Sequence, residues 1–526
     1  MKKQALISVF KKDGIVEFAR ELTEKYNYEI LSTGGTAELL RKNNISVTEV
    51  SEKTKFPEML EGRVKTLHPV IHGGLLARRD KPEHMETIAK HDIKPIDIVV
   101  INLYPFEEVV SKSSVSLEDA IENIDIGGPS MIRSAAKNYS AVTVICDSTD
   151  YNEVLNDLKQ NKGQTTLNLR EKLAIKAFQK TSLYDSKIYA YLGSSLNAVN
   201  EKSNNGSYAF PENINLNLKL KTKLRYGENP HQRAALYVPS NSQDGLANAE
   251  VLQGKELSFN NYLDLNSAWE IACEFNVQTP VCVIVKHNNP CGVAIAPDLH
   301  HAYIEAFNCD TVSAFGGIVA FNNKVDKSVA DELTKIFLEA IIAPDYSPEA
   351  LEEFKKKPNL RVLKIKVEID NSHFNEIDIK RIGQGFLVQD NNIQILIPED
   401  LKVVTKRKPT EAEMLDLIFA WKVCKHVKSN AIVIAKEGKT IGIGAGQCNR
   451  VGSVEIALNQ ASYNSKNAVL SSDAFFPFKD SIEVAAGAKI SAIIQPGGSI
   501  KDKEVIEACD KFNIAMMFTG MRHFRH

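Results

Sequence analysis

Two short apolar runs restrict the fold of this chain more than any other feature. Residues 96–103 read IDIVVINL and residues 141–146 read AVTVIC, and in neither do apolar and polar residues alternate. Runs of this kind are typical of parallel strands that are covered on both faces. Strand patterns at 4–10 and 28–33 and helical patterns at 15–26 and 36–42 accompany them. The first 195 or so residues therefore predict an α/β domain with a central parallel sheet.

Strand patterns return after residue 220, among helical stretches at 263–274 and 411–424. They read VCVIVK, GGIVAF, AIVIA, TIGIGA, AVLSS, ISAIIQ and IAMMF. A chain of 526 residues is too long for one hydrophobic core, and residues 197–219 are polar, rich in Asn and interrupted by Gly and Pro. We predict an N-terminal domain over 1–196, a linker over 197–219 and a larger body of two subdomains over 220–526. The charged stretch near 345–382 is interpreted as an insertion or connection, and no internal repeat is evident.

Charge and composition exclude several classes of protein. Lys plus Arg number 64 against 66 Asp plus Glu, a net charge of −2, so no surface for nucleic acid is expected. No apolar run approaches the roughly 18 residues that span a membrane, and the apolar part of MKKQALISVF is too short for a signal peptide. A soluble, cytoplasmic protein with no membrane partner is expected. The eight cysteines form no CxxC pair, which argues against a disulfide framework and a structural zinc site.

Three motifs of the first region carry groups suited to a phosphorylated ligand. STGGT (32–36) follows a strand and opens a helix, where backbone N–H groups bind an anion, although such a turn is also a common tight connection. RVKTLHP (63–69) is either a solvated basic loop or part of the same site. IDIGGPSMIRSAAKN (124–138) starts a helix at its Gly-Gly-Pro-Ser and puts Arg133 and Lys137 four residues apart. With Asn102 and Tyr104 after a neighbouring strand, the set favours proton transfer and electrostatic catalysis over covalent chemistry.

The stretch VCVIVKHNNPCG (281–292) suggests the chemistry of the second region. An apolar strand ends on Lys286 and His287 and is followed by what we interpret as an Asn-Asn-Pro turn. His287 is suited to act as a general base near neutral pH, and Lys286 to stabilise a developing oxyanion. The alternative is a strand end that merely reaches water.

Other motifs of the second region allow more than one interpretation. LRYGENPHQR (224–233) is either a ligand-binding loop or an exposed polar one, and capping of a helix explains one of Asn260 and Asn261. The three phenylalanines of 475–478 either stack on a flat ring or belong to the core. A zinc-deaminase site is not supported, because no second Cys follows Cys291 at the required spacing.

Eleven motifs in order along the chain resemble those of the bifunctional purine biosynthesis family, in which AICAR transformylase is joined to IMP cyclohydrolase. They are STGGT, RVKTLHP, NLYPF, DIGGPSMIRSAAKN, RYGENPHQ, KHNNPCG, SAFGG, KSNAIV, GIGAGQ, SDAFFPF and MRHFRH. The resemblance implies a methylglyoxal-synthase-like N-terminal domain and two cytidine-deaminase-like subdomains without zinc. It also implies a homodimer with transformylase sites at its interface. The implied reactions are formyl transfer from 10-formyl-tetrahydrofolate to AICAR and then ring closure to IMP, without a catalytic metal.

The resemblance also implies roles for individual residues. The catalytic residues of the cyclohydrolase are Lys65, Tyr104, Asp125 and Lys137, and its substrate contacts are Ser32, Thr33, Gly34, Gly35, Thr36, Arg63, Thr66 and Asn102. Lys286 and His287 are the catalytic pair of the transformylase, and its AICAR contacts are Arg225, Tyr226, Asn260, Gly316, Glu339, Asn430 and Arg522. Folate contacts fall on Arg450, Phe475, Pro477, Phe478, Asp480 and Gly498.

The chain departs from the family pattern in its first turn. The family has SV-x-DKTG where this chain has SVFKKDG (8–14), which puts Lys11 and Asp13 at two changed positions. Asp13 brings a carboxylate to a position where a hydroxyl helps to hold the nucleotide, which puts phosphate binding in doubt. An alternative function keeps the transformylase but makes the N-terminal domain a non-catalytic nucleotide sensor.

Overall fold

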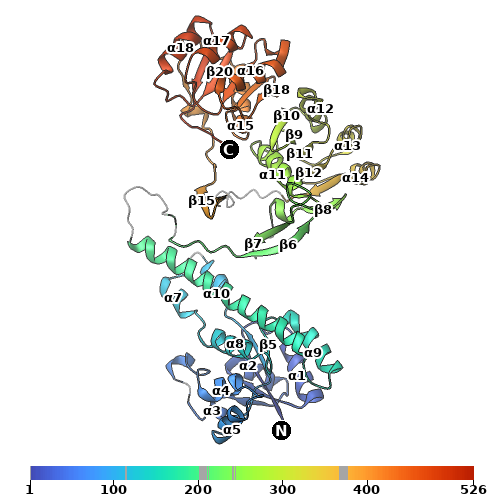
Figure 1. Cartoon of the computed structure of the whole chain (residues 1–526), viewed down its shortest axis with the longest axis vertical. Helices are drawn as coiled ribbons and strands as arrows, with labels where there is room; N and C mark the ends of the chain where they lie inside the picture. The colour runs from blue at the N-terminus through green and yellow to red at the C-terminus, as the bar shows by residue number, and fades with distance from the viewer. Residues whose placement is uncertain are drawn as a thin grey trace. The chain divides into compact units, whose positions relative to one another are not determined.

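The computed structural model describes residues 2–57, 59–112, 115–200, 210, 212–239, 242, 244–366 and 377–526. The chain divides into two compact units, Met1–Asn217 and Leu218–His526, which Figure 1 colours from blue to green and from green to red. Residues 201–209 and 211 of the predicted linker lie outside the described residues, so the predicted domain boundaries stay predictions. Within the described ranges, no helix is both long and apolar enough to cross a membrane.

Unit 1 contains a five-stranded parallel sheet with the strand order β3-β2-β1-β4-β5. Its strands are β1 (Lys3–Val9), β2 (Tyr28–Ser32), β3 (Val47–Glu49), β4 (Ile98–Asn102) and β5 (Thr143–Ile145). Its longer helices are α1 (Ile15–Tyr26), α2 (Gly34–Lys42), α4 (Pro69–Leu76), α5 (Pro82–Lys90), α8 (Gly127–Lys137), α9 (Tyr151–Gln160) and α10 (Leu167–Asn200). Short helices are α3 (Val50–Thr54), α6 (Phe106–Val110) and α7 (Leu117–Glu122).

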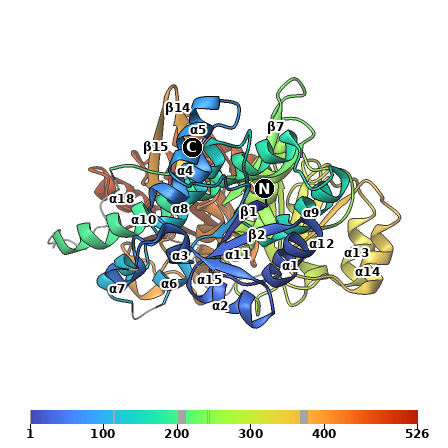
Figure 2. The same ribbon diagram turned by 90° about the horizontal axis from the view of Figure 1, so that it is seen from below.

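The two apolar runs that predicted a parallel sheet form neighbouring strands, β4 inside the sheet and β5 at its edge. Strand β4 is buried from Ile98 to Ile101, and β1, beside it, is buried from Ala5 to Ile7. Figure 2 shows β1 and β2 side by side. Because all five strands are parallel, the turns that follow β1, β2 and β4 meet at one edge of the sheet, which is where open α/β sheets bind ligands. The predicted fold class of this unit is confirmed.

Unit 2 is built on a twelve-stranded mixed sheet in the order β16-β21-β20-β19-β17-β18-β10-β9-β11-β12-β13-β8. These strands are β8 (Glu250–Gln253), β9 (Val281–Lys286), β10 (Asn289–Ile295), β11 (Ile318–Phe321), β12 (Ala340–Ala343), β13 (Arg361–Lys364), β16 (Lys402–Val403), β17 (Ile432–Lys436), β18 (Lys439–Gly444), β19 (Val469–Ser472), β20 (Ala492–Gln495) and β21 (Ala515–Phe518). Its helices are α11 (Phe259–Cys273), α12 (Leu299–Cys309), α13 (Lys327–Leu333), α14 (Pro348–Phe354), α15 (Glu411–Cys424), α16 (Arg450–Ala461), α17 (Asp480–Gly487) and α18 (Asp502–Lys511).

The sheet of unit 2 consists of two halves with one plan. Each half has a helix (α11 or α15), an antiparallel hairpin (β9–β10 or β17–β18), a second helix and then parallel strands. The halves are joined where β10 pairs with β18, with Ala294 opposite Lys439. One continuous core lies under α11 and α15, and separate cores cover the opposite face of each half. Inspection of the sequence found no repeat because the halves share a chain path rather than a residue pattern.

The charged stretch 345–382 is not the insertion that the sequence suggested. Its residues 348–354 form α14 and residues 361–364 form β13, which pairs with strands on both sides. Residues 367–376 lie outside the described residues. Two hairpins form sheets of their own, β6 (Leu218–Leu224) with β7 (Ala234–Pro239) and β14 (Ile377–Ile382) with β15 (Gly385–Asp390).

Candidate functional sites

In unit 1, the loop between β2 and α2 is held by its own hydroxyl groups. Ser32 Oγ donates to the backbone of β1 at 2.6 Å, and Thr33 Oγ1 lies 3.1 Å from Ser8 Oγ. Gly34 then has a φ of 46°, a left-handed conformation that suits glycine, and both Gly34 and Gly35 are exposed. The first N–H groups of α2 therefore face solvent at the ligand-binding edge of the sheet, where the helix dipole favours an anion.

Two lysines lie at the start of α2, and one of them is absent from the residues predicted above. Lys12 Nζ donates to Thr36 Oγ1 at 2.7 Å and also to the Val9 carbonyl oxygen, and burial lowers the pKa of Lys12. A Cβ built on Gly34 would lie 3.7 Å from Lys65 Nζ. Both ammonium groups therefore reinforce an anion site at STGGT. The position of Lys12 in the turn after β1, a strand parallel to the one that precedes STGGT, is the signal that could have identified it.

Asp125 lies at the start of α8 and is held there by hydrogen bonds. The carboxylate accepts the Gly128 N–H at 2.8 Å, and the Asp125 N–H donates to the Tyr184 hydroxyl at 2.7 Å. A Cβ at Gly128 would lie 2.3 Å from Asp125 Oδ2, and one at Gly127 would lie 2.5 Å from Thr66 Oγ1. A side chain at either position would clash, so both glycines are required for Thr66 and Asp125 to lie this close to the start of α8.

The electrostatics of Asp125 suit proton transfer. Burial raises the pKa of its carboxyl, while hydrogen bonds from the Gly128 and Tyr104 backbones and the positive charge of Lys65 oppose that rise. A raised pKa brings a carboxyl closer to the operating pH, which is where a general acid or base works best. Lys65, Tyr104 and Asp125, predicted together, are therefore brought together.

Other predicted residues of unit 1 have structural partners. Asn102 holds the turn after β1, since its Oδ1 accepts the Lys11 N–H at 3.2 Å and its Nδ2 donates to the Lys11 carbonyl oxygen at 2.8 Å. The side chain of Lys11, at a position changed from the family pattern, pairs with Glu108 at 2.6 Å. Arg63 is exposed and forms an ion pair with Glu122.

Lys137 is the predicted catalytic residue that lies apart from this group. It is the last residue of α8, ten residues beyond Gly127, and is exposed. Ten residues of α-helix span about 15 Å. Arg133, on the same helix, has its guanidinium carbon 5.6 Å from the centre of the Phe178 ring. The start of α8, where Asp125 lies, and the end of α8, where Lys137 lies, are therefore separate places within one chain.

In unit 2, Lys286 and His287 lie at the end of the β9–β10 hairpin. Lys286 pairs with Asn289 across the hairpin, and His287 and Asn288 between them have φ angles of 55° and 61°. Two left-handed residues in succession make the turn that suits the twist of a two-residue hairpin. The predicted Asn-Asn-Pro turn (288–290) overlaps the observed turn only at Asn288, since Asn289 and Pro290 already lie in β10.

The catalytic candidates of this hairpin have different surroundings. Lys286 Nζ donates to the Phe315 carbonyl oxygen at 2.7 Å, next to the predicted Gly316. His287 is exposed, and the Asn288 N–H donates to Asp264 of α11 at 2.6 Å. The backbone of the turn is therefore fixed while the imidazole ring faces solvent.

Asn289 links this hairpin to the second half of the sheet. Its Oδ1 accepts the Lys428 N–H at 3.0 Å, two residues before the predicted Asn430. Asn430 Oδ1 accepts a hydrogen bond from Arg450 at 2.6 Å, and its Nδ2 donates to the Gln447 carbonyl oxygen at 2.8 Å. The predicted Lys286, His287 and Asn430 thus lie in one connected region.

Arg450, predicted to contact folate, is an internal residue. Only 6% of it is exposed, and one guanidinium nitrogen donates to Asp473 at 2.6 Å and to Ser472 at 2.8 Å. With Asn430 on its other nitrogen, this guanidinium has protein partners on both sides. Its geometry is that of a residue that positions Asn430.

The loop that follows β6 packs at the start of α11. The guanidinium of Arg225 lies over the Tyr226 ring at 4.5 Å, and Asn260 Nδ2 donates to the Glu228 carbonyl oxygen at 3.2 Å. Ser258, rather than either asparagine, caps α11, and Asn261 completes its capping box. Asn260 lies one helical turn before Asp264, so RYGENPHQ and the β9–β10 hairpin are held by one face of α11.

The remaining predicted contacts of unit 2 lie on several elements. Gly316 has a φ of 73° and donates its N–H to the Phe337 carbonyl oxygen at 2.8 Å. Glu339 Oε2 accepts from the buried Arg361 at 2.7 Å. The guanidinium of Arg522 is exposed and lies 4.4 Å from the centre of the Phe524 ring.

The SDAFFPF segment offers two aromatic rings to solvent. Phe475 and Phe478 are 38% and 59% exposed, whereas Phe476 between them is buried in the core under α16 and α17. The core interpretation is therefore correct for Phe476, whereas stacking of Phe475 and Phe478 on a flat ring stays a prediction. Pro477 is half-buried, Asp480 is exposed at the first position of α17, and Gly498 has a φ of 97°.

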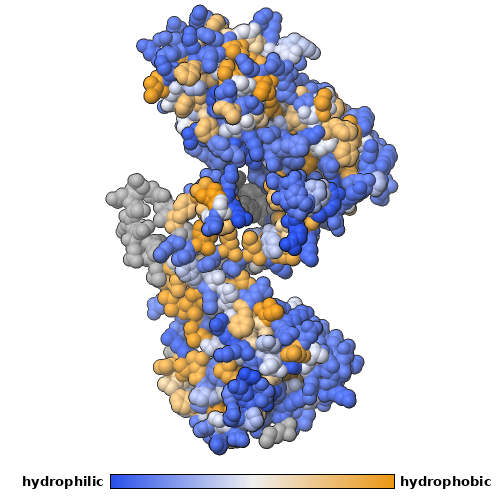
Figure 3. Space-filling view, in the orientation of Figure 1, coloured by the Kyte–Doolittle hydropathy of each residue, from blue (hydrophilic) through white to orange (hydrophobic). Residues whose placement is uncertain are grey.

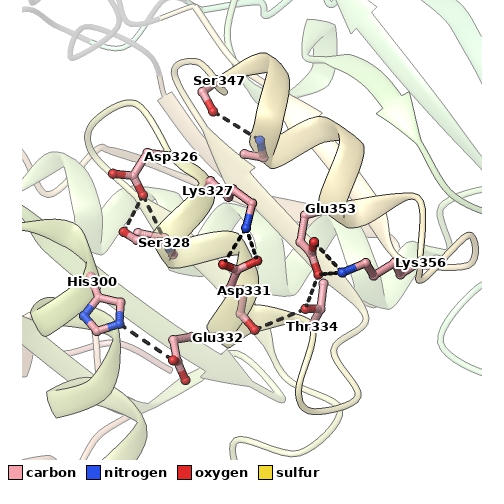
Figure 4. A network of polar contacts seen from close by, with 12 residues as sticks. His300, Asp326, Lys327, Ser328, Asp331, Glu332, Thr334, Ser347, Glu353 and Lys356 are labelled. Atoms are coloured by element: carbon pink, nitrogen blue, oxygen red, sulfur yellow. Dashed lines mark hydrogen bonds and ion pairs between the residues drawn. The ribbon is translucent and has the colours of Figure 1, made fainter.

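Two further polar clusters on unit 2 lie apart from the predicted residues. Asp298, His300 and His301 are the one group of His, Cys, Asp or Glu in the described ranges whose donor atoms converge enough for a metal ion, and Asp298 also caps α12. A surface hollow near α13 and α14 is lined by charged side chains that pair with one another (Figure 4), among them Lys356 with Glu353 at 2.6 Å. Because these charged side chains bind one another, they offer no group of side chains directed at a substrate. We therefore assign neither cluster a role in catalysis.

Comparisons with known proteins agree on one family. The family model described as "AICARFT/IMPCHase bienzyme" matches residues 135–460, and the "MGS-like domain" model matches residues 14–130. Proteins named "Bifunctional purine biosynthesis protein PurH" are similar over the whole of both chains. The one from a Thermoanaerobacter species is 55% identical, that from Listeria monocytogenes 53% and that from Caldicellulosiruptor saccharolyticus 52%.

Proposed function

Because this chain belongs to the AICARFT/IMPCHase bienzyme family, we propose that its two units divide the two reactions of that family between the two sites described above. The chain is a bifunctional enzyme of purine biosynthesis. It transfers a formyl group from a folate-type donor to AICAR and closes the ring of formyl-AICAR to give IMP. We assign ring closure to residues 1–196 and formyl transfer to residues 220–526. The convergence of Lys65, Thr66 and Asp125 at the start of α8 carries the first assignment.

For ring closure, the phosphate of formyl-AICAR binds at the start of α2, between Lys12 and Lys65. The carboxamide nitrogen attacks the formyl carbon, a carbon–nitrogen bond forms, and the former carbonyl oxygen leaves as water. Asp125 accepts a proton from the nitrogen, because burial raises the pKa of its carboxyl towards the range of a working base. Lys65 and Tyr104 stabilise the charge that develops on oxygen.

For formyl transfer, His287 accepts a proton from the 5-amino group of AICAR as its nitrogen attacks the formyl carbon. Lys286 stabilises the oxyanion, and the bond to the folate nitrogen then breaks, releasing tetrahydrofolate. We propose 10-formyl-tetrahydrofolate as the donor. Its flat ring stacks on Phe475 and Phe478, whose exposure supports this role, and Arg225, Asn260 and Arg522 contact AICAR.

We propose that neither reaction uses a metal. Both steps need only proton transfer and charge stabilisation, and the described residues supply those groups. Chelator is therefore expected to leave both rates unchanged, and recovery on added zinc after a loss would contradict this proposal.

We propose that the enzyme is a homodimer. The hairpin β14–β15 exposes large apolar side chains, with Phe386 66% and Leu387 56% exposed, and Figure 3 shows orange over this hairpin. Helix α10 exposes Ile175 in the same way, at 72%. Surfaces of this kind are typical of contacts with another protein chain, here a second copy.

The proposal is tested by incubating the enzyme with AICAR and 10-formyl-tetrahydrofolate. Tetrahydrofolate and IMP are expected in equal amounts. The alternative, an N-terminal nucleotide sensor, predicts accumulation of formyl-AICAR and binding of IMP without turnover. The joint presence of Lys65, Tyr104 and Asp125 argues against it, since a sensor needs no positioned proton donor.

A further inference from the structure

The turn that carries His287 is held by a carboxylate from another element. Asp264 accepts the Asn288 N–H at 2.6 Å, and the His287 N–H is within reach of the same carboxylate. Both residues of the turn have left-handed backbones, a conformation that non-glycine residues rarely adopt. Asp264 thus adds a hydrogen bond from α11 to a turn that the twist of the hairpin also favours.

Asp264 also acts on His287 through its charge. Burial raises the pKa of the Asp264 carboxyl, and its hydrogen bonds from the turn and its attraction to the charge of His287 oppose that rise. When His287 takes a proton from the substrate amine, a positive charge appears on its ring. A negative charge already fixed behind the turn favours that change.

In the second half of the sheet, an aspartate holds a hairpin turn in the same way, but that turn contains no predicted catalytic residue. Asp416 accepts the Glu437 N–H at 2.9 Å and the Gly438 N–H at 2.8 Å, in the two-residue turn of the β17–β18 hairpin. Both turn residues again have positive φ angles, of 54° and 70°. Asp416 is the sixth residue of α15, as Asp264 is the sixth of α11.

The two turns lie well apart although their hairpins are neighbours. The turn of Asp416 lies near the Ile295 end of β10, since the Ile295 N–H donates to Gly438, whereas His287 precedes the Asn289 end. Six residues of strand span about 20 Å. The second turn therefore serves as an internal comparison, with the same structural task and no substrate nearby.

We propose that Asp264 is a positioning residue of formyl transfer, which holds the His287 turn in its left-handed form and places a negative charge behind the base. This inference rests on the proposed function, because it takes His287 as the base. Asp264 differs from Asp416 in the turn that it holds, because only the turn at Asp264 contains the base His287. Loss of either carboxylate weakens a hairpin, but only loss of Asp264 slows the reaction.

The test compares Asp264→Asn with Asp416→Asn in the full-length enzyme. Both variants are expected to lower the melting temperature by a similar few degrees, since each weakens the same pair of backbone contacts. Asp264→Asn is expected to lower kcat of formyl transfer by about 10- to 100-fold, with KM for AICAR within about twofold of the unchanged enzyme. Asp416→Asn is expected to have the same kcat of formyl transfer as the enzyme without substitutions. Both variants are expected to retain ring closure of supplied formyl-AICAR.

A second variant separates backbone strain from charge. Asn288→Gly, added to Asp264→Asn, supplies a residue that adopts positive φ freely, so it is expected to restore stability without restoring kcat. Recovery of kcat by this change, or an unchanged kcat in Asp264→Asn, would overturn the inference. Absence of formyl transfer in the unchanged enzyme would instead count against the proposed function.

Discussion

At the scale of single residues, the two adjacent lysines after β1 have opposite environments. Lys12 turns towards the start of α2, where it donates to Thr36, while Lys11 turns outward to Glu108. The sequence shows two similar residues side by side. Only the geometry distinguishes the one that faces the anion site.

Lys12→Ala is expected to weaken binding of formyl-AICAR by about 10- to 100-fold, the effect of losing one charge-assisted hydrogen bond. Formyl transfer is expected to be unaffected. The measurement is KM and kcat of ring closure on supplied formyl-AICAR. Lys11→Ala is the matched control and is expected to keep the unchanged KM, so equal effects of the two variants would place the phosphate elsewhere.

The predicted site residues show what residue type can and cannot reveal. Lys65, Asp125 and His287 stay predicted site residues, and they were selected because a charged group next to a glycine turn or strand end has few structural uses. Arg450 was predicted to bind folate, but its guanidinium is engaged by Asp473 and Asn430. Those partners lie 20 or more residues away in sequence, so no local pattern could reveal that the guanidinium is already bound.

At the scale of elements, helices and strands followed the sequence closely, whereas their connections did not. The helices predicted at 15–26 and 411–424 have those bounds in the structure. The hairpin turn at His287 was misplaced because asparagine and proline are strong turn residues, and the preference of the hairpin for two left-handed residues was decisive instead. The stretch 345–382 looked like an insertion because its charges lie on α14, which covers the sheet.

Helices α11 and α15 are joined by an ionic cluster that titrates in acid. Burial alone would raise the pKa of the Glu274 carboxyl, but hydrogen bonds and charges of His426 and Lys425 outweigh burial and lower the pKa to about 2. A carboxyl with a lowered pKa stabilises the fold above its unfolded value, near 4.5, and loses that contribution as the pH falls towards 2.

The free energy of unfolding is therefore expected to fall by about 2–3 kcal/mol through Glu274 between pH 5 and pH 2. Glu274→Gln is expected to show a smaller loss over this interval, because its side chain does not titrate. Urea unfolding at a series of pH values measures the difference. Glu504→Gln, at an exposed position of α18, is expected to keep the acid dependence of the unchanged enzyme, and an equal change in both variants would contradict the assignment.

At the scale of the whole molecule, the two proposed sites lie on separate compact units. His287→Ala is expected to abolish formyl transfer and to leave ring closure of supplied formyl-AICAR at its full rate, because unit 1 folds around its own core. The control is His301→Ala, because His301 is an exposed histidine of unit 2, like His287. This variant is expected to leave both activities unchanged. Loss of both activities in a folded His287→Ala enzyme would show that the units depend on each other.

The place of Lys137 gives the homodimer a test of its own. Since the backbone of Lys137 lies about 15 Å along α8 from Gly127, we propose that Lys137 serves the ring-closure site of a second copy. Lys65→Ala and Lys137→Ala are then each inactive in ring closure, but co-expressed chains are expected to recover about a quarter of the activity, because each mixed dimer has one intact site. No recovery, or full activity of Lys137→Ala alone, would contradict that role.

The joining of the two sheet halves at β10 and β18 has a consequence for how unit 2 folds. Within each half, the strands pair with one another over a stretch of about 120 residues, from β8 to β13 and from β16 to β21. The two halves are joined by a single strand pairing, that of β10 with β18. Local pairing closes shorter loops and forms faster than distant pairing. Each half is thus expected to collapse as a unit during synthesis, with docking of β18 on β10 as the late step that completes the transformylase site.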